Sequence, residues 1–175
     1  MSSSQLNGLA IRPAIRADSD AVRALVFGIL REFGFTPDPS GTDSDLADLE
    51  ASYLVPGGAF DLLYDADGEL LGCAGVYPMK EGTAELRKMY LRPAARGKGL
   101  GRFLLEHSLE RARALGFRVM VLQTASVLGD AVALYRRAGF RSYEPADRVS
   151  RCDVALRLDL ISSATDTAAP TDAQS

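Results

Sequence analysis

Two periodicities of hydrophobic and polar positions run along the chain, and each predicts its own kind of element. Apolar residues that recur every three to four positions, with a capping residue in front and a glycine behind, predict helices. On this basis we expect helices at residues 19–31, 44–54, 100–115 and 129–138. Apolar residues that alternate with polar ones, or that form a short continuous run, predict strands. We expect strands at residues 11–15, 59–64, 69–78, 83–91, 117–124, 139–144 and 151–160.

The order of these elements predicts the fold class. The turn "DADG" at 65–68 joins its two neighbouring strands into a hairpin, so the first half of the sheet should be antiparallel. The helix at 100–115 is a crossover between two strands, which makes that central pair parallel. We therefore expect an α+β domain over residues 11–160, with a mixed central sheet of about seven strands and helices on both faces. Residues 1–10 should be flexible, and the small polar residues of 161–175 should be disordered.

Composition excludes several classes of protein. Hydrophobic residues make up 47% of the chain, charged residues 25%, and the net charge of −3 disfavours non-specific binding to nucleic acid. No apolar run approaches the length of a membrane span, and the N-terminus lacks the features of a signal peptide. The two cysteines, Cys73 and Cys152, are too few for a disulfide framework or a zinc site. We expect a cytoplasmic monomer or homodimer with no metal and no nucleic-acid or membrane partner.

Charge is unevenly distributed along the sequence. Residues 36–69 contain nine acidic side chains and no Lys or Arg, whereas residues 85–118 contain nine Lys or Arg and three Glu. Both blocks are compatible with solvated surfaces of opposite sign, but they also suit an anion site and a cation site. A cationic or polyamine-like ligand is one expectation from the first acidic positions, Asp38, Asp43, Asp45, Asp48 and Glu50.

The stretch "RPAARGKGLGRFLLEHSL" at 92–109 places glycine at 97, 99 and 101, where a helix should begin. Glycine disfavours a helix, so another requirement must act here. Without side chains, backbone N–H groups can converge on an anion, and a helix N-terminus adds a positive dipole end. The stretch lacks the Walker pattern, and Arg102 stands where a Rossmann fingerprint starting at Gly97 needs its last glycine. A plain turn remains the alternative, although it needs neither three glycines nor flanking basic residues.

Two motifs resemble the GNAT superfamily of acetyl-CoA-dependent N-acetyltransferases. "RGKGLG" matches that family's [RQ]-x-x-G-x-[GA] motif, and "DAVALYRRAGF" at 130–140 is similar to its later A-x-x-L-Y-x-x-x-G-F pattern. The resemblance implies a GNAT-like fold in which the strand at 83–91 and the strand ending at Thr124 splay apart around the thioester. It also implies a strand-like contact with pantetheine at Met89, Tyr90 and Leu91. The residues that it implies around the pyrophosphate are Arg96, Gly97, Lys98, Gly99, Leu100, Gly101 and Arg102.

Acetyl transfer to an amine requires a base, because an alkylammonium with a pKa of about 10.4 has no lone pair. It also benefits from a proton donor beside the leaving thiolate. The resemblance implies that Tyr135 is that donor, while Leu128 stands where the family often has a pantetheine-binding asparagine. Gln123 is a further candidate for holding a substrate or a water.

Glu85 is the candidate base, because it precedes Arg96 by eleven residues, as the glutamate base does in the histone-acetylating branch of the superfamily. The alternative is a strand-edge glutamate paired with Arg87 or Lys88. Strand alternation predicts that Glu85, Arg87, Met89 and Leu91 share one face.

The resemblance implies transfer of an acetyl group from acetyl-CoA to a primary amine of a small molecule or peptide, by direct attack in a ternary complex. A catalytically silent acetyl-CoA-binding regulatory module is the main alternative. A toxin that acetylates aminoacyl-tRNA is disfavoured by the sequence pI of about 5.2, because RNA binding favours basic surfaces.

Overall fold

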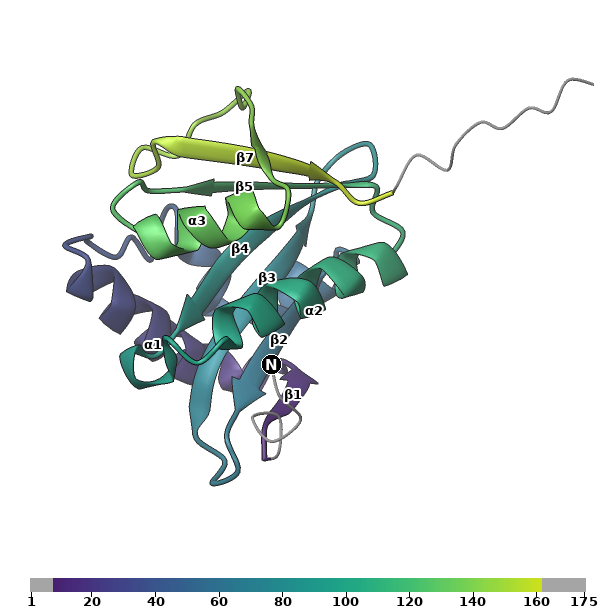
Figure 1. The fold of residues 1–175 in the computed structure, drawn as a ribbon. Coiled ribbons are helices and arrows are strands. Elements are labelled where there is room, and N and C mark those ends of the chain that lie inside the picture. Colours follow the sequence, from purple (N-terminus) through teal and green to yellow (C-terminus); the bar gives the residue numbers. More distant parts are fainter. Residues whose placement is uncertain (1–7, 162–175) are drawn as a thin grey trace, which may run out of the picture.

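The computed structural model describes residues 8–161 and contains a mixed sheet with the strand order β1-β2-β3-β4-β5-β7-β6 (Figure 1). The pair β4–β5 is parallel and the other neighbouring pairs are antiparallel. This arrangement confirms the expected fold class. The strands are β1 (Ala10–Pro13), β2 (Ala59–Tyr64), β3 (Leu70–Pro78), β4 (Thr83–Leu91), β5 (Val119–Thr124), β6 (Arg141–Ser142) and β7 (Val154–Asp159).

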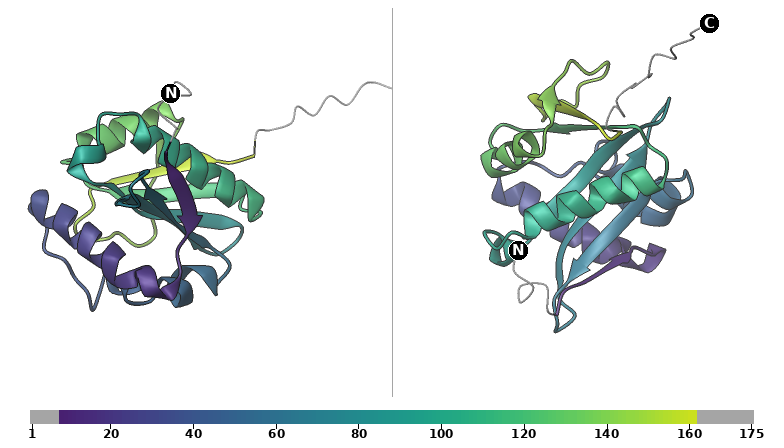
Figure 2. Two further views of the ribbon diagram at one scale, coloured as in Figure 1. Left: turned by 90° about the horizontal axis from the view of Figure 1, so that it is seen from below. Right: turned by 45° about the vertical axis from the view of Figure 1, so that its right-hand side comes forward.

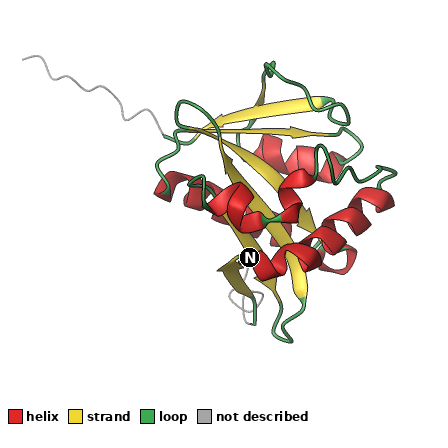
Figure 3. Cartoon of the chain, turned by 180° about the vertical axis from the view of Figure 1, so that it is seen from behind, coloured by secondary structure: helices red, strands yellow, loops and turns green. Residues whose placement is uncertain are grey.

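Helices cover both faces of this sheet. Helices α2 (Leu100–Ala114) and α3 (Gly129–Arg137) lie on one face, and α1 (Ser19–Glu32) lies on the other (Figure 2). Two short helical segments, η3 (Ser44–Ala47) and η4 (Glu50–Leu54), join α1 on its face, which is seen from behind in Figure 3. Within residues 8–161, no helix is long and apolar enough to cross a bilayer.

Each face of the sheet has its own hydrophobic core. On the α2 and α3 face, Leu104, Met120 and Leu156 are fully buried. On the α1 face, Val22 and Val26 are fully buried, since a spacing of four places both on the side of α1 that meets the sheet. The sheet is therefore covered by a helical layer on each face.

The helix expected at 44–54 does not form as one element. The backbone of Asp48 is extended (φ −149°, ψ 99°), which ends η3. The Asp48 side chain instead accepts a hydrogen bond of 3.0 Å from the N–H of Ala51 in the next segment. A short acidic side chain that bonds the backbone three residues ahead competes with helix continuation. The apolar positions Leu46, Leu49 and Tyr53 are nevertheless buried. The hydrophobic pattern therefore predicted the buried positions correctly, but the expectation of one continuous helix was wrong.

A β-bulge in β4 overturns the expected sharing of one face. Gly75 of β3 lies opposite Arg87, but Cys73 lies opposite Tyr90, so β4 contains one extra residue at this point. Lys88 takes the left-handed conformation there, with φ of 53°. Because the extra residue reverses the alternation, Met89 and Leu91 pack into the core under α2 and α3, together with Leu86. The side chains of Glu85 and Arg87 lie on the α1 side.

The ends of the elements differ from the expected ones by a few residues. Strand β6 is only Arg141–Ser142, and β7 begins at Val154 rather than at 151. Residues 1–7 and 162–175 lie outside the described part, and most of the ends that we expect to be flexible or disordered fall there. Ala10 already belongs to β1.

Candidate active site

The site lies where β4 and β5 separate. In the described chain these strands pair over three residues, from Thr83–Val119 to Glu85–Val121, and then diverge (Figure 1). A cavity of about 1050 Å³ lies at this opening. It reaches the loop before α2 at Gly97 and Gly101, and it reaches Glu85 on β4. A cavity of this size suits a small-molecule ligand.

The glycine loop borders the cavity at the N-terminus of α2. Gly97 and Gly99 have φ of 73° and 78°, which a residue with a Cβ adopts only with strain. Gly101 is different, because its φ is not positive and an added Cβ would meet only Leu134 at 3.5 Å and Leu91 at 3.7 Å. Neither backbone nor protein packing requires glycine at 101. Its missing side chain therefore leaves room beside the unpaired N–H groups of the first helical turn.

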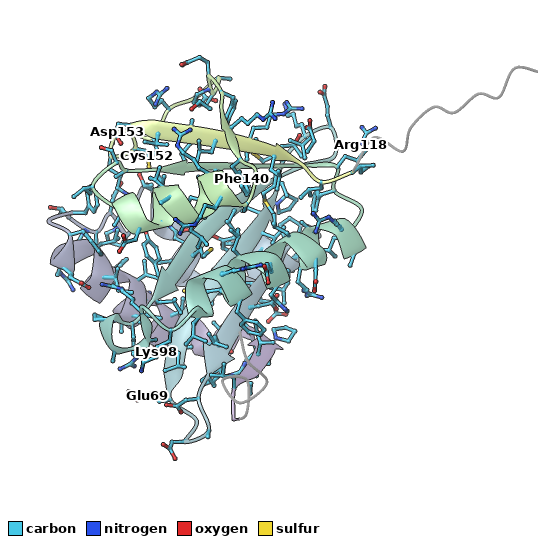
Figure 4. All side chains as sticks on the ribbon, in the orientation of Figure 1. Glu69, Lys98, Arg118, Phe140, Cys152 and Asp153 are labelled. Carbon is cyan, nitrogen blue, oxygen red and sulfur yellow. The ribbon has the colours of Figure 1, made fainter. Side chains whose placement is uncertain are left out.

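Two of the three basic side chains in and beside this loop, Arg96 and Arg102, bond to other groups of the protein. Arg96 donates to the Leu91 carbonyl at 3.1 Å and forms a bidentate pair with Glu32 of α1 at 2.6 and 3.0 Å. The Arg96 hydrogen bond lowers the pKa of Glu32. Arg102 pairs with Glu106 at 2.6 Å on the exposed face of α2, and Lys98 lies on the outer surface of the loop (Figure 4). An anion at this loop would therefore meet backbone N–H groups before it met a free guanidinium.

The predicted residues divide into two groups. Lys98, Gly99, Leu100 and Arg102 do not border the cavity. The structure brings the others together around it, as a set made of Glu85, Met89, Tyr90, Leu91, Arg96, Gly97, Gly101 and Tyr135.

Tyr135 of α3 borders the cavity and is itself 6% exposed. Its ring packs against Phe140, with ring centroids 5.8 Å apart. Burial raises the pKa of the Tyr135 phenol well above its ordinary value, and the neighbouring Tyr90 raises it further. This phenol therefore keeps its proton at neutral pH and can donate a hydrogen bond into the cavity.

Glu85 borders the cavity and is also an ion-pair partner. The residue is 7% exposed, and one carboxylate oxygen accepts a hydrogen bond from Nε of Arg87. The guanidinium of Arg87 lies 3.7 Å from the centre of the Tyr77 ring. The pairing with Arg87 that we weighed as the alternative is thus present, while the candidate base still faces the cavity. Lys88 is not its partner.

A buried ion cluster beside Glu85 was not anticipated. Asp43 accepts hydrogen bonds from Lys88 at 2.6 Å and from Arg151 at 2.5 and 2.9 Å. Burial alone would raise the pKa of Asp43, but the bonds from Arg151, the Asp38 N–H and Lys88 outweigh it and hold that pKa well below its usual range. Arg151 lies 108 residues along the chain from Asp43, so no local pattern could have revealed the pair.

This cluster changes the expectation of a cationic acceptor. Of the five acids on which it rested, Asp43 is neutralised inside the protein and Asp48 pairs with Arg16 at 3.0 Å. These two carboxylates are therefore not free to bind a cationic acceptor.

Gln123 forms hydrogen bonds with the loop that precedes Arg151. Its amide nitrogen donates to the Asp147 carbonyl at 2.8 Å, and its amide oxygen accepts from the Val149 N–H at 3.0 Å. The side chain that we considered for holding a substrate or a water is therefore already engaged. Leu128, at the position of the family's asparagine, borders the cavity with an apolar side chain.

Comparisons with known proteins agree with this geometry. The family model described as Acetyltransferase (GNAT) family matches residues 26–140. The uncharacterized N-acetyltransferase YjgM of Escherichia coli is 35% identical over 134 residues, which cover 74% of this chain and 80% of that protein. A GNAT-family acetyltransferase from Staphylococcus aureus Mu50 superposes with a TM-score of 0.81 at 21% identity, over 87% of this chain and 99% of the other.

A further solved structure, yncA from Salmonella typhimurium with its cofactor acetyl-CoA, has a TM-score of 0.69 and 26% identity over 92% of this chain and 99% of the other. Fold, cavity and matches together define an acyltransferase. The chain belongs to the Acetyltransferase (GNAT) family.

Proposed function

We propose that this protein transfers the acetyl group of acetyl-CoA to the primary amine of a small molecule or peptide, with both substrates bound at once. One observation carries the proposal. A single cavity extends from the glycines at the start of α2 to the carboxylate of Glu85, so the two substrates can meet between the separated strands. Acetyl-CoA would supply the thioester, and the residues of the chain would bind, orient and exchange protons.

The cavity walls fit the two halves of that co-substrate. The N–H groups at the start of α2 suit a diphosphate, because Gly97 and Gly101 present no side chain there. Beyond Glu85, the edge of β4 that faces β5 has no strand partner in the described chain. The backbone of Met89 and the N–H of Leu91 can therefore bond the amides of the pantetheine arm as another strand would, while the Leu91 carbonyl already accepts from Arg96.

Glu85 is the residue that would take a proton from the acceptor. An ammonium must lose one proton before its nitrogen can attack, and Glu85 borders the cavity within the same sheet opening. The N–C bond then forms and the C–S bond breaks, with the electron pair leaving on sulfur. The nitrogen loses its second proton, so for each turnover one proton ends on the thiol and one reaches solvent.

Tyr135 would donate a hydrogen bond to the departing sulfur. Its raised pKa opposes complete proton transfer, since a thiol has a pKa of about 8.5 and the buried phenol holds its proton more tightly. Donation without full transfer still stabilises developing negative charge at the sulfur.

Release of free thiol from acetyl-CoA in the presence of a panel of amines tests this function. We expect thiol release that depends on both the enzyme and an amine. A catalytically silent module would bind acetyl-CoA in a calorimeter without releasing thiol for any amine, and that outcome would contradict the proposal.

A further inference from the structure

The Glu85 end of the cavity, by which we mean Asp45, Tyr77, Glu85, Arg87, Lys88 and Arg151, contains charges that are almost fully paired. Lys88 and Arg151 both donate to Asp43, directly behind the cavity wall. Glu85 accepts from Arg87. The groups at this end that keep hydrogen-bonding capacity should therefore reveal what the acceptor carries.

Arg87 keeps the largest unused capacity. Its Nε donates to Glu85, but among residues 8–161 its two terminal nitrogens have no acceptor. The side chain is 33% exposed at the cavity, and its contact with the Tyr77 ring holds the guanidinium plane in one orientation. A planar pair of guanidinium N–H groups matches a carboxylate with two parallel hydrogen bonds.

Asp45 is also engaged within the protein. Its side chain is 9% exposed, and its Oδ2 accepts from the Tyr53 hydroxyl. Its Oδ1 is buried and forms an ion pair with Lys88 Nζ at 3.4 Å. This carboxylate is therefore already paired, and Arg87 is left as the charged group that can bind a ligand.

We propose that the acceptor is an α-amino acid or a close analogue, with Arg87 binding its carboxylate and Glu85 facing its ammonium. The inference rests on the proposed function and specifies its substrate class. Glu85 and Arg87 are two residues apart on one face of β4, roughly 7 Å between Cα atoms. An α-amino acid carries its ammonium and its carboxylate on the same carbon atom, so it can lie along this ion pair and meet both partners.

The charge balance of proton transfer supports the same assignment. When Glu85 takes a proton it becomes neutral, and Arg87 loses its carboxylate partner. At that moment the acceptor, with a neutral amine and an ionised carboxylate, carries one negative charge, and Arg87 can pair with it. A polyamine offers no such compensation, because it would place further positive charge beside Arg87, Lys88 and Arg151.

The test compares α-amino acids with their carboxamides, which keep the amine and the side chain but lose the negative charge. For the wild type we expect kcat/KM to favour the acid by about 10- to 100-fold, mainly through KM. In Arg87→Gln this ratio should fall towards one, and Arg87→Lys, which keeps the charge without the planar fork, should be intermediate. The ammonium of the carboxamide loses its proton more readily than that of the acid, so kcat/KM is expressed on the free-amine concentration of each acceptor. Each enzyme is measured on the same two acceptors, so any remaining difference between them cancels when enzymes are compared.

Arg23→Gln is the matched control, because Arg23 lies on α1, outside the cavity, and bonds Asp20. It should leave the acid-to-amide ratio unchanged. An equal loss for both acceptors in Arg87→Gln would show that Arg87 acts only through Glu85 and would overturn the proposal. A wild type that prefers polyamines or carboxamides would overturn it while leaving the proposed function standing. Binding of acetyl-CoA without turnover of any amine would remove the proposed function and this inference with it.

Discussion

Substitution of Gly101 by valine separates binding of the co-substrate from stability of the fold. The new Cβ would lie 3.5 Å from Leu134 Cδ2 and 3.7 Å from Leu91 Cδ1. Methyl groups extend about 1.5 Å beyond Cβ, so a methyl directed at either leucine would come within about 2 Å of it. The methyls must therefore turn into the cavity, where the N–H groups of α2 face the proposed diphosphate.

The expected loss follows from the hydrogen bonds that this crowding removes. Each bond to a charged group contributes about 1.5–3 kcal/mol, so loss of two weakens binding by about 10²- to 10⁴-fold. The fold should hold, because glycine is less favourable than valine inside a helix by a few tenths of a kcal/mol, roughly. Gly99→Val is a weaker test, since φ of 78° makes any Cβ strained there.

Calorimetric titration with acetyl-CoA, together with a thermal melt, measures both effects. Gly101→Ala is the closest control, because a single methyl fits at 3.5 Å and the motif itself admits alanine at this position. Gly28→Val places the same substitution on the exposed side of α1 and should bind normally. A Gly101→Val protein that melts like the wild type and binds acetyl-CoA with unchanged affinity would refute the phosphate cradle.

Three further predictions concern proton transfer and the buried cluster. Glu85→Gln should lower kcat/KM by about 10²- to 10⁴-fold at neutral pH. A pH–rate profile should show that this loss becomes smaller as the pH approaches the pKa of the amine. Near-normal rates at neutral pH would show that Glu85 is not the base and only pairs with Arg87. Tyr135→Phe should lower kcat without changing acetyl-CoA affinity. A fully active variant would show that the Tyr135 hydroxyl has no catalytic role and that the residue serves only in packing. Asp43→Asn should cost about 3–5 kcal/mol in urea unfolding, because Lys88 and Arg151 stay buried without their carboxylate. Because the pKa of Asp43 is lowered in the folded state, its ionised carboxylate stabilises the wild type above the ordinary carboxylate pKa of about 3.9, and this stabilisation is lost as the pH falls below that value. Between roughly pH 5 and pH 2 the Asn variant should therefore lose less stability than the wild type. An equal loss in both proteins would contradict this reasoning.

Local features of the chain were predictable from the sequence because their causes lie within a few residues. Periodicity predicted α1, α2, α3 and the strands, and the hairpin turn and the crossover helix predicted the parallel pair at β4–β5. The glycines at 97, 99 and 101 predicted a loop at a helix start, because backbone conformation and helix propensity are local properties, and α2 begins there. The anion site at this loop stays a prediction.

The composition of the Glu85 end was decided only in three dimensions. One left-handed residue, Lys88, reverses the alternation of β4, and no pattern of apolar positions records where a bulge will fall. The acidic segment at 36–69 suggested a cation site in the sequence. In the structure, Arg151 and Lys88 come from distant parts of the chain and neutralise Asp43. Sequence patterns show which side chains are polar or charged. Whether a charge is paired within the protein or is available to a ligand depends on which partner the fold brings within hydrogen-bond distance.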